Sequence, residues 1–204
     1  SEALMTVYRL FWDEFSAWYL ELIKPAYVDG KQQPIDETSM NATLHFFETL
    51  MQMLHPFMPF ITEELWQHIT ERKPGESIMT STLKIGEAQA ADIKLCADME
   101  VVKQIVANVR AIRNEKNIAP KKELELQAIG ENHYDSYSSI IVKMANLKSL
   151  SVADNKAADA SSFMVGTDEF AVPIGDLIDV DAEIEKQEKE LQHLNGFLEK
   201  KKKK

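Results

Sequence analysis

Basic and amide side chains recur at helical spacing between residues 101 and 122, followed by a pair of lysines. The stripe is Lys103, Arg110, Asn114 and Asn117, its flanks are Arg113 and Lys116, and Lys121 and Lys122 follow Pro120. Arginine can fork across two phosphate oxygens, lysine can neutralise a phosphate, and asparagine can read a base edge. The segment therefore predicts a nucleic-acid contact, and the alternative is an ordinary solvated helix face.

Charge is distributed unevenly along the 204 residues. The chain carries 23 Lys and Arg against 33 Asp and Glu, and the resulting net charge of -10 repels nucleic acid. Residues 101–122 depart from this average, because they hold six cationic side chains and the single acid Glu115, a local charge of about +5. This local island, rather than the total, decides where a phosphate backbone could bind.

Other residue types show no catalytic or metal-binding spacing. The five histidines, at positions 45, 55, 68, 133 and 193, form neither a zinc pattern nor a triad, and the adjacent Glu63 and Glu64 suit the first turn of a helix. Cys96 is the only cysteine, which excludes an internal disulfide and indicates a reducing compartment. The sequence has no secretory leader and no apolar run near the ~20 residues that span a bilayer. We therefore expect a cytoplasmic chain with no catalytic group, no metal and no membrane contact.

Apolar residues at helical spacing predict three helices in the first 75 residues. The first stripe ends before Pro25, Asp36 can cap the second helix, and Pro59 can begin the third. The three stripes are Leu4, Tyr8, Phe11, Phe15, Trp18 and Leu22; Met40, Leu44, Phe47, Met51 and Leu54; and Ile61, Leu65, Trp66 and Ile69. Long amphipathic helices with short connections predict an antiparallel helical bundle over residues 1–75.

The middle of the chain changes character. Residues 76–122 should hold a connection, with an extended piece at 77–83, and then the basic helix, which buries Val102, Ile105, Val109 and Ile112. Residues 123–178 have strand patterns at 124–129, 150–152, 162–165 and 170–174 and a helical pattern at 134–147. This order predicts a small α+β unit.

Heptad spacing marks the last part of the sequence. Ile184, Leu191 and Leu198 lie seven residues apart, so residues 179–204 should begin a coiled-coil helix, with an isolated solvated helix as the alternative. The predicted fold class is therefore mainly α: a helical bundle, a small α+β unit and the start of a C-terminal coiled coil.

One motif connects these elements to a known family. In LHPFMPFITEELW, residues 54–66, two prolines turn the chain between helices, and Phe57, Phe60, Leu65 and Trp66 should fill the corner. The motif resembles the signature of the anticodon-binding helical bundle of class I aminoacyl-tRNA synthetases for branched aliphatic amino acids.

Three further segments narrow the resemblance to the valyl-tRNA synthetase family. They are FWDEFSAWYLELIKP at 11–25, VRAIRNEKNIAPKK at 109–122 and FAVPIGDLIDVDAEIEKQEKEL at 170–191. The family usually has Cys-Asp before the Trp-Tyr pair, where this chain has Ser16 and Ala17. The corresponding region of an isoleucyl- or leucyl-tRNA synthetase is the near alternative, and a helical adaptor with a terminal coiled coil is an alternative of another class.

The resemblance implies a function for the longer protein and for this part of it. The parent enzyme would join valine to its tRNA using ATP and magnesium, as a monomer whose catalytic domain lies elsewhere in the same chain. This fragment, with no HIGH-type or KMSKS-type motif, no editing domain and no first bundle helix, would be inactive and bind the anticodon stem and loop of valine tRNA without a cofactor. Trp12 and Tyr19 could stack on unpaired bases or pack against the missing helix.

Overall fold

The computed structural model describes residues 2–25, 27–28, 30–84, 86–131 and 133–175. It divides into two compact units, Ser1–Gln89 and Ala90–Lys204, which are described separately below. The predicted coiled coil at 179–204 lies outside the described residues. No helix in the described part of the chain is long and apolar enough to cross a membrane.

The first unit opens with one long helix that changes its winding. It consists of α1 (Glu2–Arg9), the π-helical η1 (Leu10–Tyr19) and α2 (Leu20–Ile23). The predicted helix is confirmed, and it ends as expected, because Lys24 before the proline has an extended ψ of 125°.

The π-helical segment was not predicted, and it corrects the apolar stripe. Its i→i+5 hydrogen bonds, such as that from the Leu20 N–H to the Phe15 carbonyl, widen the turn, so residues four apart stay near one face. Tyr19 therefore stacks on Phe15 at 5.5 Å between ring centroids and packs against the core. Val7 is buried in place of the expected Tyr8, which is 49% exposed.

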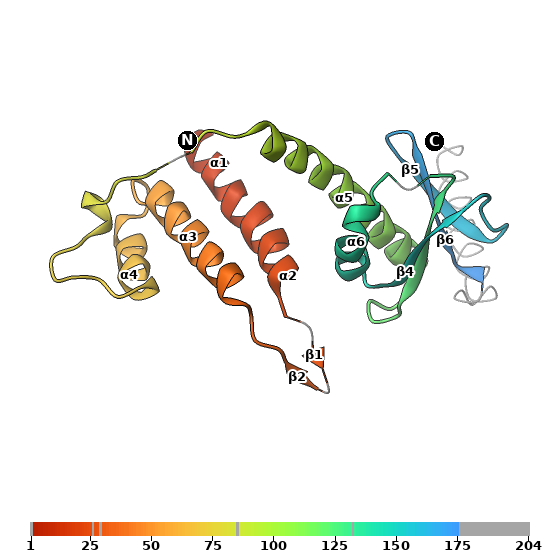
Figure 1. Ribbon diagram of the computed structural model, residues 1–204, viewed down its shortest axis with the longest axis horizontal. Coiled ribbons are helices and arrows are strands. Elements are labelled where there is room, and N and C mark those ends of the chain that lie inside the picture. Colours follow the sequence, from red (N-terminus) through yellow and green to blue (C-terminus); the bar gives the residue numbers. More distant parts are fainter. Residues whose placement is uncertain (1, 26, 29, 85, 132, 176–204) are drawn as a thin grey trace, which may run out of the picture. The chain divides into compact units, whose positions relative to one another are not determined.

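The second helix follows a short hairpin of β1 (Tyr27–Val28) and β2 (Lys31–Gln32). It is α3 (Glu37–Leu54), and the predicted cap is confirmed: the Ser39 N–H donates to Asp36 Oδ1 at 2.8 Å. Figure 1 shows α3 running back along α1 and η1 in the opposite direction. The resulting core contains Val7, Phe15, Leu50, Met51, Leu54, Trp66 and Ile78, with partly buried Leu4, Phe11, Tyr19, Leu20, Phe47, Met53 and Ile69 around it.

The corner after α3 is held by hydrogen bonds more than by aromatic packing. Pro59 begins α4 (Pro59–Ile69), as predicted. The buried Thr62 hydroxyl donates to the Met58 carbonyl at 2.8 Å and accepts from His55 Nδ1 at 2.8 Å, because its one hydrogen is already used.

The expectation that four large side chains fill this corner is wrong for three of them. Phe57, Phe60 and Leu65 are 39%, 91% and 37% exposed, and only Trp66 is buried. Thr62 and Trp66, one turn apart, form the buried face of α4, which turns Ile61 and Leu65 away from it.

The segment after α4 is tied to the bundle by polar contacts. Arg72 lies 3.6 Å from the centre of the Trp66 ring and pairs with Glu48 of α3. Glu63 accepts from the Ser77 hydroxyl at 2.6 Å, and η2 (Ile78–Thr80) is a single helical turn. The extended piece predicted at 77–83 is therefore incorrect over η2.

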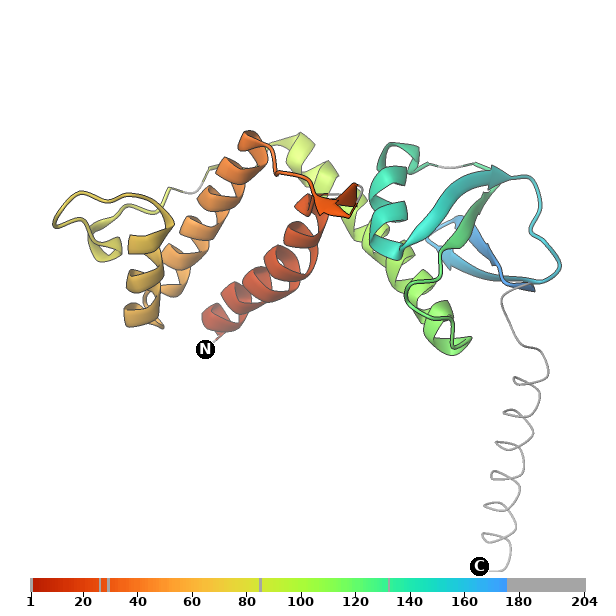
Figure 2. The ribbon, with the colours of Figure 1, turned by 90° about the horizontal axis from the view of Figure 1, so that it is seen from below.

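The second unit is a four-stranded mixed sheet with helices on one face (Figure 2). Its elements are α5 (Ala90–Glu115), β3 (Leu124–Ile129), η3 (Asp135–Tyr137), α6 (Ser138–Ala145), β4 (Leu147–Ala153), β5 (Ala160–Val165) and β6 (Asp168–Pro173). The strand order is β4-β3-β6-β5, with β3 and β4 parallel and the other pairs antiparallel.

Alternation along β3 separates the two faces of this sheet. Leu124, Leu126 and Ala128 are buried, together with Val102 and Ile105 of α5. The predicted strands and α5 core face are confirmed, and the helix predicted at 134–147 is confirmed over α6, since η3 is a short 3-10 turn and Leu147 begins β4. Helix α5 begins at Ala90, and its first eight residues, 90–97, are exposed, so they carry no apolar stripe by which the sequence could have shown the start of the helix.

Candidate nucleic-acid interface

Helix α5 carries most of the predicted stripe, with Asn117 and the flanking Lys116 just beyond its end, and four of the six predicted cations have partners within the chain. Lys103 is partly buried and lies 2.8 Å from Glu100, and Lys116 lies 2.8 Å from Glu115. Arg110 is exposed, and its Nη2 donates to the Met144 carbonyl at 2.7 Å. In each case a hydrogen-bond donor that was predicted to bind phosphate already has a partner within the chain.

Arg113 lies in the core of the second unit, which corrects the expectation that it flanks an exposed face. Only 6% of the residue is exposed, and burial lowers the pKa of its guanidinium from its ordinary value. Its Nη1 donates to the Ala119 and Lys122 carbonyls at 3.1 and 2.5 Å. Its Nη2 donates to the Ala145 and Asn146 carbonyls, both at 3.2 Å.

The turn that follows α5 gives the two asparagines a structural setting. Asn117 has a left-handed backbone with φ of 52°, which asparagine tolerates better than most residues. Its N–H donates to the Asn114 carbonyl at 3.2 Å, and the Ile118 N–H donates to the Arg113 carbonyl at 2.8 Å. This pair of bonds is a Schellman motif, so Asn117 is explained by helix termination, while Asn114 and Asn117 both remain exposed.

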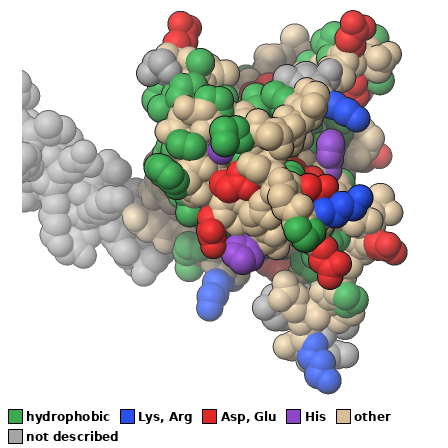
Figure 3. All heavy atoms as spheres, turned by 90° about the vertical axis from the view of Figure 1, so that its left-hand side faces the viewer, with side chains coloured by type: hydrophobic (Ala, Val, Ile, Leu, Met, Phe, Trp, Pro, Cys, Tyr) green, Lys and Arg blue, Asp and Glu red, His purple; other side chains and the backbone are tan. Residues whose placement is uncertain are grey.

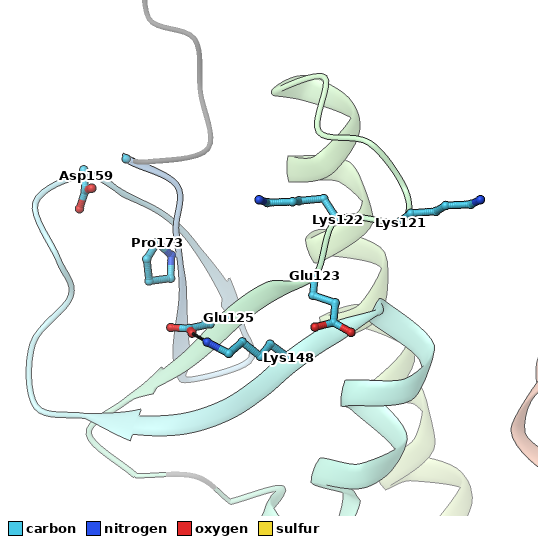
Figure 4. A pocket seen from close by; sticks show the side chains of 8 residues that line it. Lys121, Lys122, Glu123, Glu125, Lys148, Asp159 and Pro173 are labelled. Carbon is cyan, nitrogen blue, oxygen red and sulfur yellow. Dashed lines mark hydrogen bonds and ion pairs between the residues drawn. The ribbon is translucent and has the colours of Figure 1, made fainter. Parts of the chain in front are cut away.

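Lys121 and Lys122 are exposed on the segment that leads into β3, beside a hollow of ≈ 610 Å³. We call it the sheet-end hollow, and it is lined by Lys121, Lys122, Glu123, Glu125, Lys148, Asp159, Pro173 and Gly175. In Figure 4 the two lysine side chains point in opposite directions from the chain, while Lys148 pairs with Glu125 at 3.0 Å. That pairing raises the pKa of Lys148.

The two lysines differ from the other cations of the segment. Among the described residues, neither Lys121 nor Lys122 has a side-chain hydrogen bond or a carboxylate partner, whereas Lys103 and Lys116 both have one. The arrangement can therefore neutralise phosphates without reading sequence. No group of three His, Cys, Asp or Glu side chains that could hold a metal ion occurs in the described part of the chain.

The sequence analysis missed an apolar groove of ≈ 490 Å³ in the first unit. We define it by its lining residues: Leu4, Met5, Tyr8, Phe11, Trp12, Met51, Leu54, Met58, Ile61, Thr62 and Leu65. Trp12 is 56% exposed there and stacks on Tyr8, so only one of the two aromatic candidates is accessible, since Tyr19 packs in the core. Figure 3, which faces α4, shows hydrophobic side chains gathered toward one side of this face. The sequence contains a signal for this groove, because Met5, Tyr8 and Trp12 form a second apolar stripe on the first helix.

Known proteins resemble this chain over most of its length. The family model described as the anticodon-binding domain of tRNA ligase matches residues 1–128. Valine-tRNA ligase of Bacteroides thetaiotaomicron is 55% identical over 201 residues, and that of Porphyromonas gingivalis is 44% identical over 198. Valine-tRNA ligase of Christiangramia forsetii is 37% identical over 199. Each match covers 97–98% of this chain, which spans 22% of the length of these relatives. The chain belongs to the family of anticodon-binding domains of tRNA ligases.

Proposed function

We propose that this chain is the tRNA-binding portion of a valine-tRNA ligase and docks the anticodon stem and loop of valine tRNA. The observation that carries the proposal is the 55% identity over 98% of the chain to a protein of that name. Relatives of the same name at 44% and 37% identity favour valine over the isoleucine and leucine alternatives.

The rest of the proposed ligase would perform the chemistry. Its catalytic domain, in the same polypeptide, would join valine to tRNA with ATP and magnesium, and the protein would act as a cytoplasmic monomer. We assign this chain no part in that step, because the hydroxyl that lies against a histidine, that of Thr62, is buried at the corner between α3 and α4 and already donates to the Met58 carbonyl.

The docking surface we propose is the end of α5 and the segment that follows it. Lys121 and Lys122 supply sequence-independent phosphate contacts, and Arg110 and Asn114 lie exposed on the last turns of α5. A net charge of -10 repels RNA from most of the chain, so binding is confined to this local excess of positive charge. Arg113 is excluded from direct contact by its burial.

The apolar groove has a separate proposed role within the ligase. Its lining is apolar apart from Thr62, and the relatives that this chain matches are longer, since the chain spans 22% of their length. Exposed apolar patches of this kind mark contact surfaces. We propose that the residues preceding this chain in the longer protein form the first helix of the bundle and cover the groove. A helical adaptor would instead use the groove to bind another protein.

A salt titration of tRNA binding tests the proposal. Full-length ligase is mixed with transcribed valine tRNA at several salt concentrations, with Lys121→Ala/Lys122→Ala as the test variant. Affinity falls as salt rises, so the slope of log affinity against log salt is negative. The loss of two phosphate contacts should make this slope less steep by about 1.4 to 1.8. Lys84→Ala/Lys94→Ala removes two exposed positive charges outside the surface and should leave the slope nearly unchanged. If wild-type protein shows no salt-dependent binding, the tRNA proposal fails.

A further inference from the structure

A buried cation without a carboxylate partner needs another source of compensation. Within the described part of the chain, the four hydrogen bonds of the Arg113 side chain all go to backbone carbonyl oxygens. Two of these, from Ala145 and Asn146, belong to the C-terminal end of α6, where unpaired carbonyls and the helix dipole concentrate negative charge. The guanidinium therefore caps α6 from a neighbouring helix.

The same guanidinium closes the turn that carries the two lysines. Its Nη1 reaches the carbonyls of Ala119 and Lys122, so both ends of the segment 119–122 are bonded to one rigid group. Asn146 adds a second tie, because its Nδ2 donates to the Pro120 carbonyl at 2.7 Å. Lys121 thus stands between Pro120, whose carbonyl is bonded to Asn146 at the end of α6, and Lys122, whose carbonyl is bonded to Arg113 of α5.

This arrangement separates the group that holds the segment from the groups that face solvent. The hydrogen bonds of Arg113 go to backbone carbonyls, whereas the exposed side chains of Lys121 and Lys122 extend away from the same segment in opposite directions (Figure 4). A segment ordered before binding loses less conformational entropy when it meets its ligand.

We infer that Arg113 is a positioning residue for RNA binding, which anchors the 119–122 segment to α6 so that Lys121 and Lys122 meet phosphates at fixed positions. The inference rests on the proposed function, because it concerns how the proposed docking surface is held. Arg113 itself touches no RNA.

Arginine is required for this geometry. A planar fork can reach two carbonyls on each side, whereas the ammonium of a lysine directs three donors from one nitrogen. Arg113→Lys therefore keeps the positive charge but cannot span both Lys122 and Ala145. Asn146→Gly removes only the side-chain tie to Pro120, and glycine adopts the left-handed backbone of that position, where φ is 52°.

The test is a double-mutant cycle on salt-dependent binding of transcribed valine tRNA to the full-length protein. Arg113→Lys should make the salt slope less steep, toward that of Lys121→Ala/Lys122→Ala. The change in its magnitude should be up to about 1.4 to 1.8. Added to the double-lysine variant, it should cause no further change, because the contacts it controls are already gone. Asn146→Gly should give a smaller loss in the same direction, and it decides the question if Arg113→Lys is not folded by circular dichroism.

Other results separate the inference from the proposal beneath it. If the lysine variant makes the slope less steep while Arg113→Lys and Asn146→Gly leave it unchanged, or add to the change independently, Arg113 is structural only and the inference is overturned. If the lysine variant itself leaves binding unchanged, the proposed surface is wrong and the inference falls with it.

Discussion

Replacing Arg113 by methionine should destabilise the second unit selectively. Methionine has a similar length and fills the site, but it leaves the carbonyls of Ala119, Lys122, Ala145 and Asn146 without their donor. A hydrogen bond to a charged group contributes about 1.5 to 3 kcal/mol when buried. One of the four bonds is fully buried and three are partly buried, so we expect a loss of roughly 3 kcal/mol in the free energy of unfolding.

The distribution of tryptophan gives this prediction an internal control. Trp12, Trp18 and Trp66 all lie in the first unit, so their fluorescence during urea unfolding reports that unit, while circular dichroism reports both. Arg113→Met should shift a circular dichroism transition and leave the tryptophan transition in place. Arg110→Met, which removes the partly buried bond to the Met144 carbonyl from an exposed arginine, should cost about 1 kcal/mol. A loss for Arg113→Met no larger than for Arg110→Met would refute the reasoning.

Three further predictions concern the first unit. Asp36→Ala should lower its urea midpoint, whereas Asp36→Asn still accepts from Ser39. That bond lowers the pKa of Asp36 below 3.8. The stabilisation is therefore present above pH 3.8 and is lost as the pH falls through the pKa of the folded state. The Asn variant has no carboxyl group to protonate, so its stability should not show this loss in a pH series. Thr62→Val should cost about 1 kcal/mol, since it leaves the partly buried His55 Nδ1 and Met58 carbonyl without the Thr62 hydroxyl, and Thr62→Ser should cost less. Trp12→Ala should barely change the melting temperature of this chain, because Trp12 is exposed in it, but should lower the melting temperature of the full-length ligase. Equal shifts of the two melting temperatures would contradict the proposed cover of the groove.

Local spacing predicted most of the helices and strands, because their periodicity and boundary signals lie within a few residues of each other. The cap at Asp36, the start of α4 at Pro59 and the alternation along β3 are of this kind. The π-helical segment was not predictable in the same way. Its wider turn changes which residues share a face, and this moved Tyr19 into the core.

The candidate site was predicted less well, because a helical wheel does not show what lies opposite each face. Arg113 follows Val109 by four residues and Val106 by seven, so it belongs to the buried face by spacing, and its charge led to the opposite expectation. Only the tertiary arrangement brings the end of α6 to this position. The corner motif shows the same limit, since it indicated the family but not that Phe60 stays exposed.

Deleting the anticodon stem and loop from the RNA tests the central proposal most directly. The affinity of full-length protein, wild type and Lys121→Ala/Lys122→Ala, is measured for whole valine tRNA and for the same RNA without that stem and loop. We predict that the lysine variant binds whole tRNA more weakly than wild type and that both proteins bind the truncated RNA equally. A lysine effect of the same size on both RNAs would contradict docking of the anticodon arm by this chain.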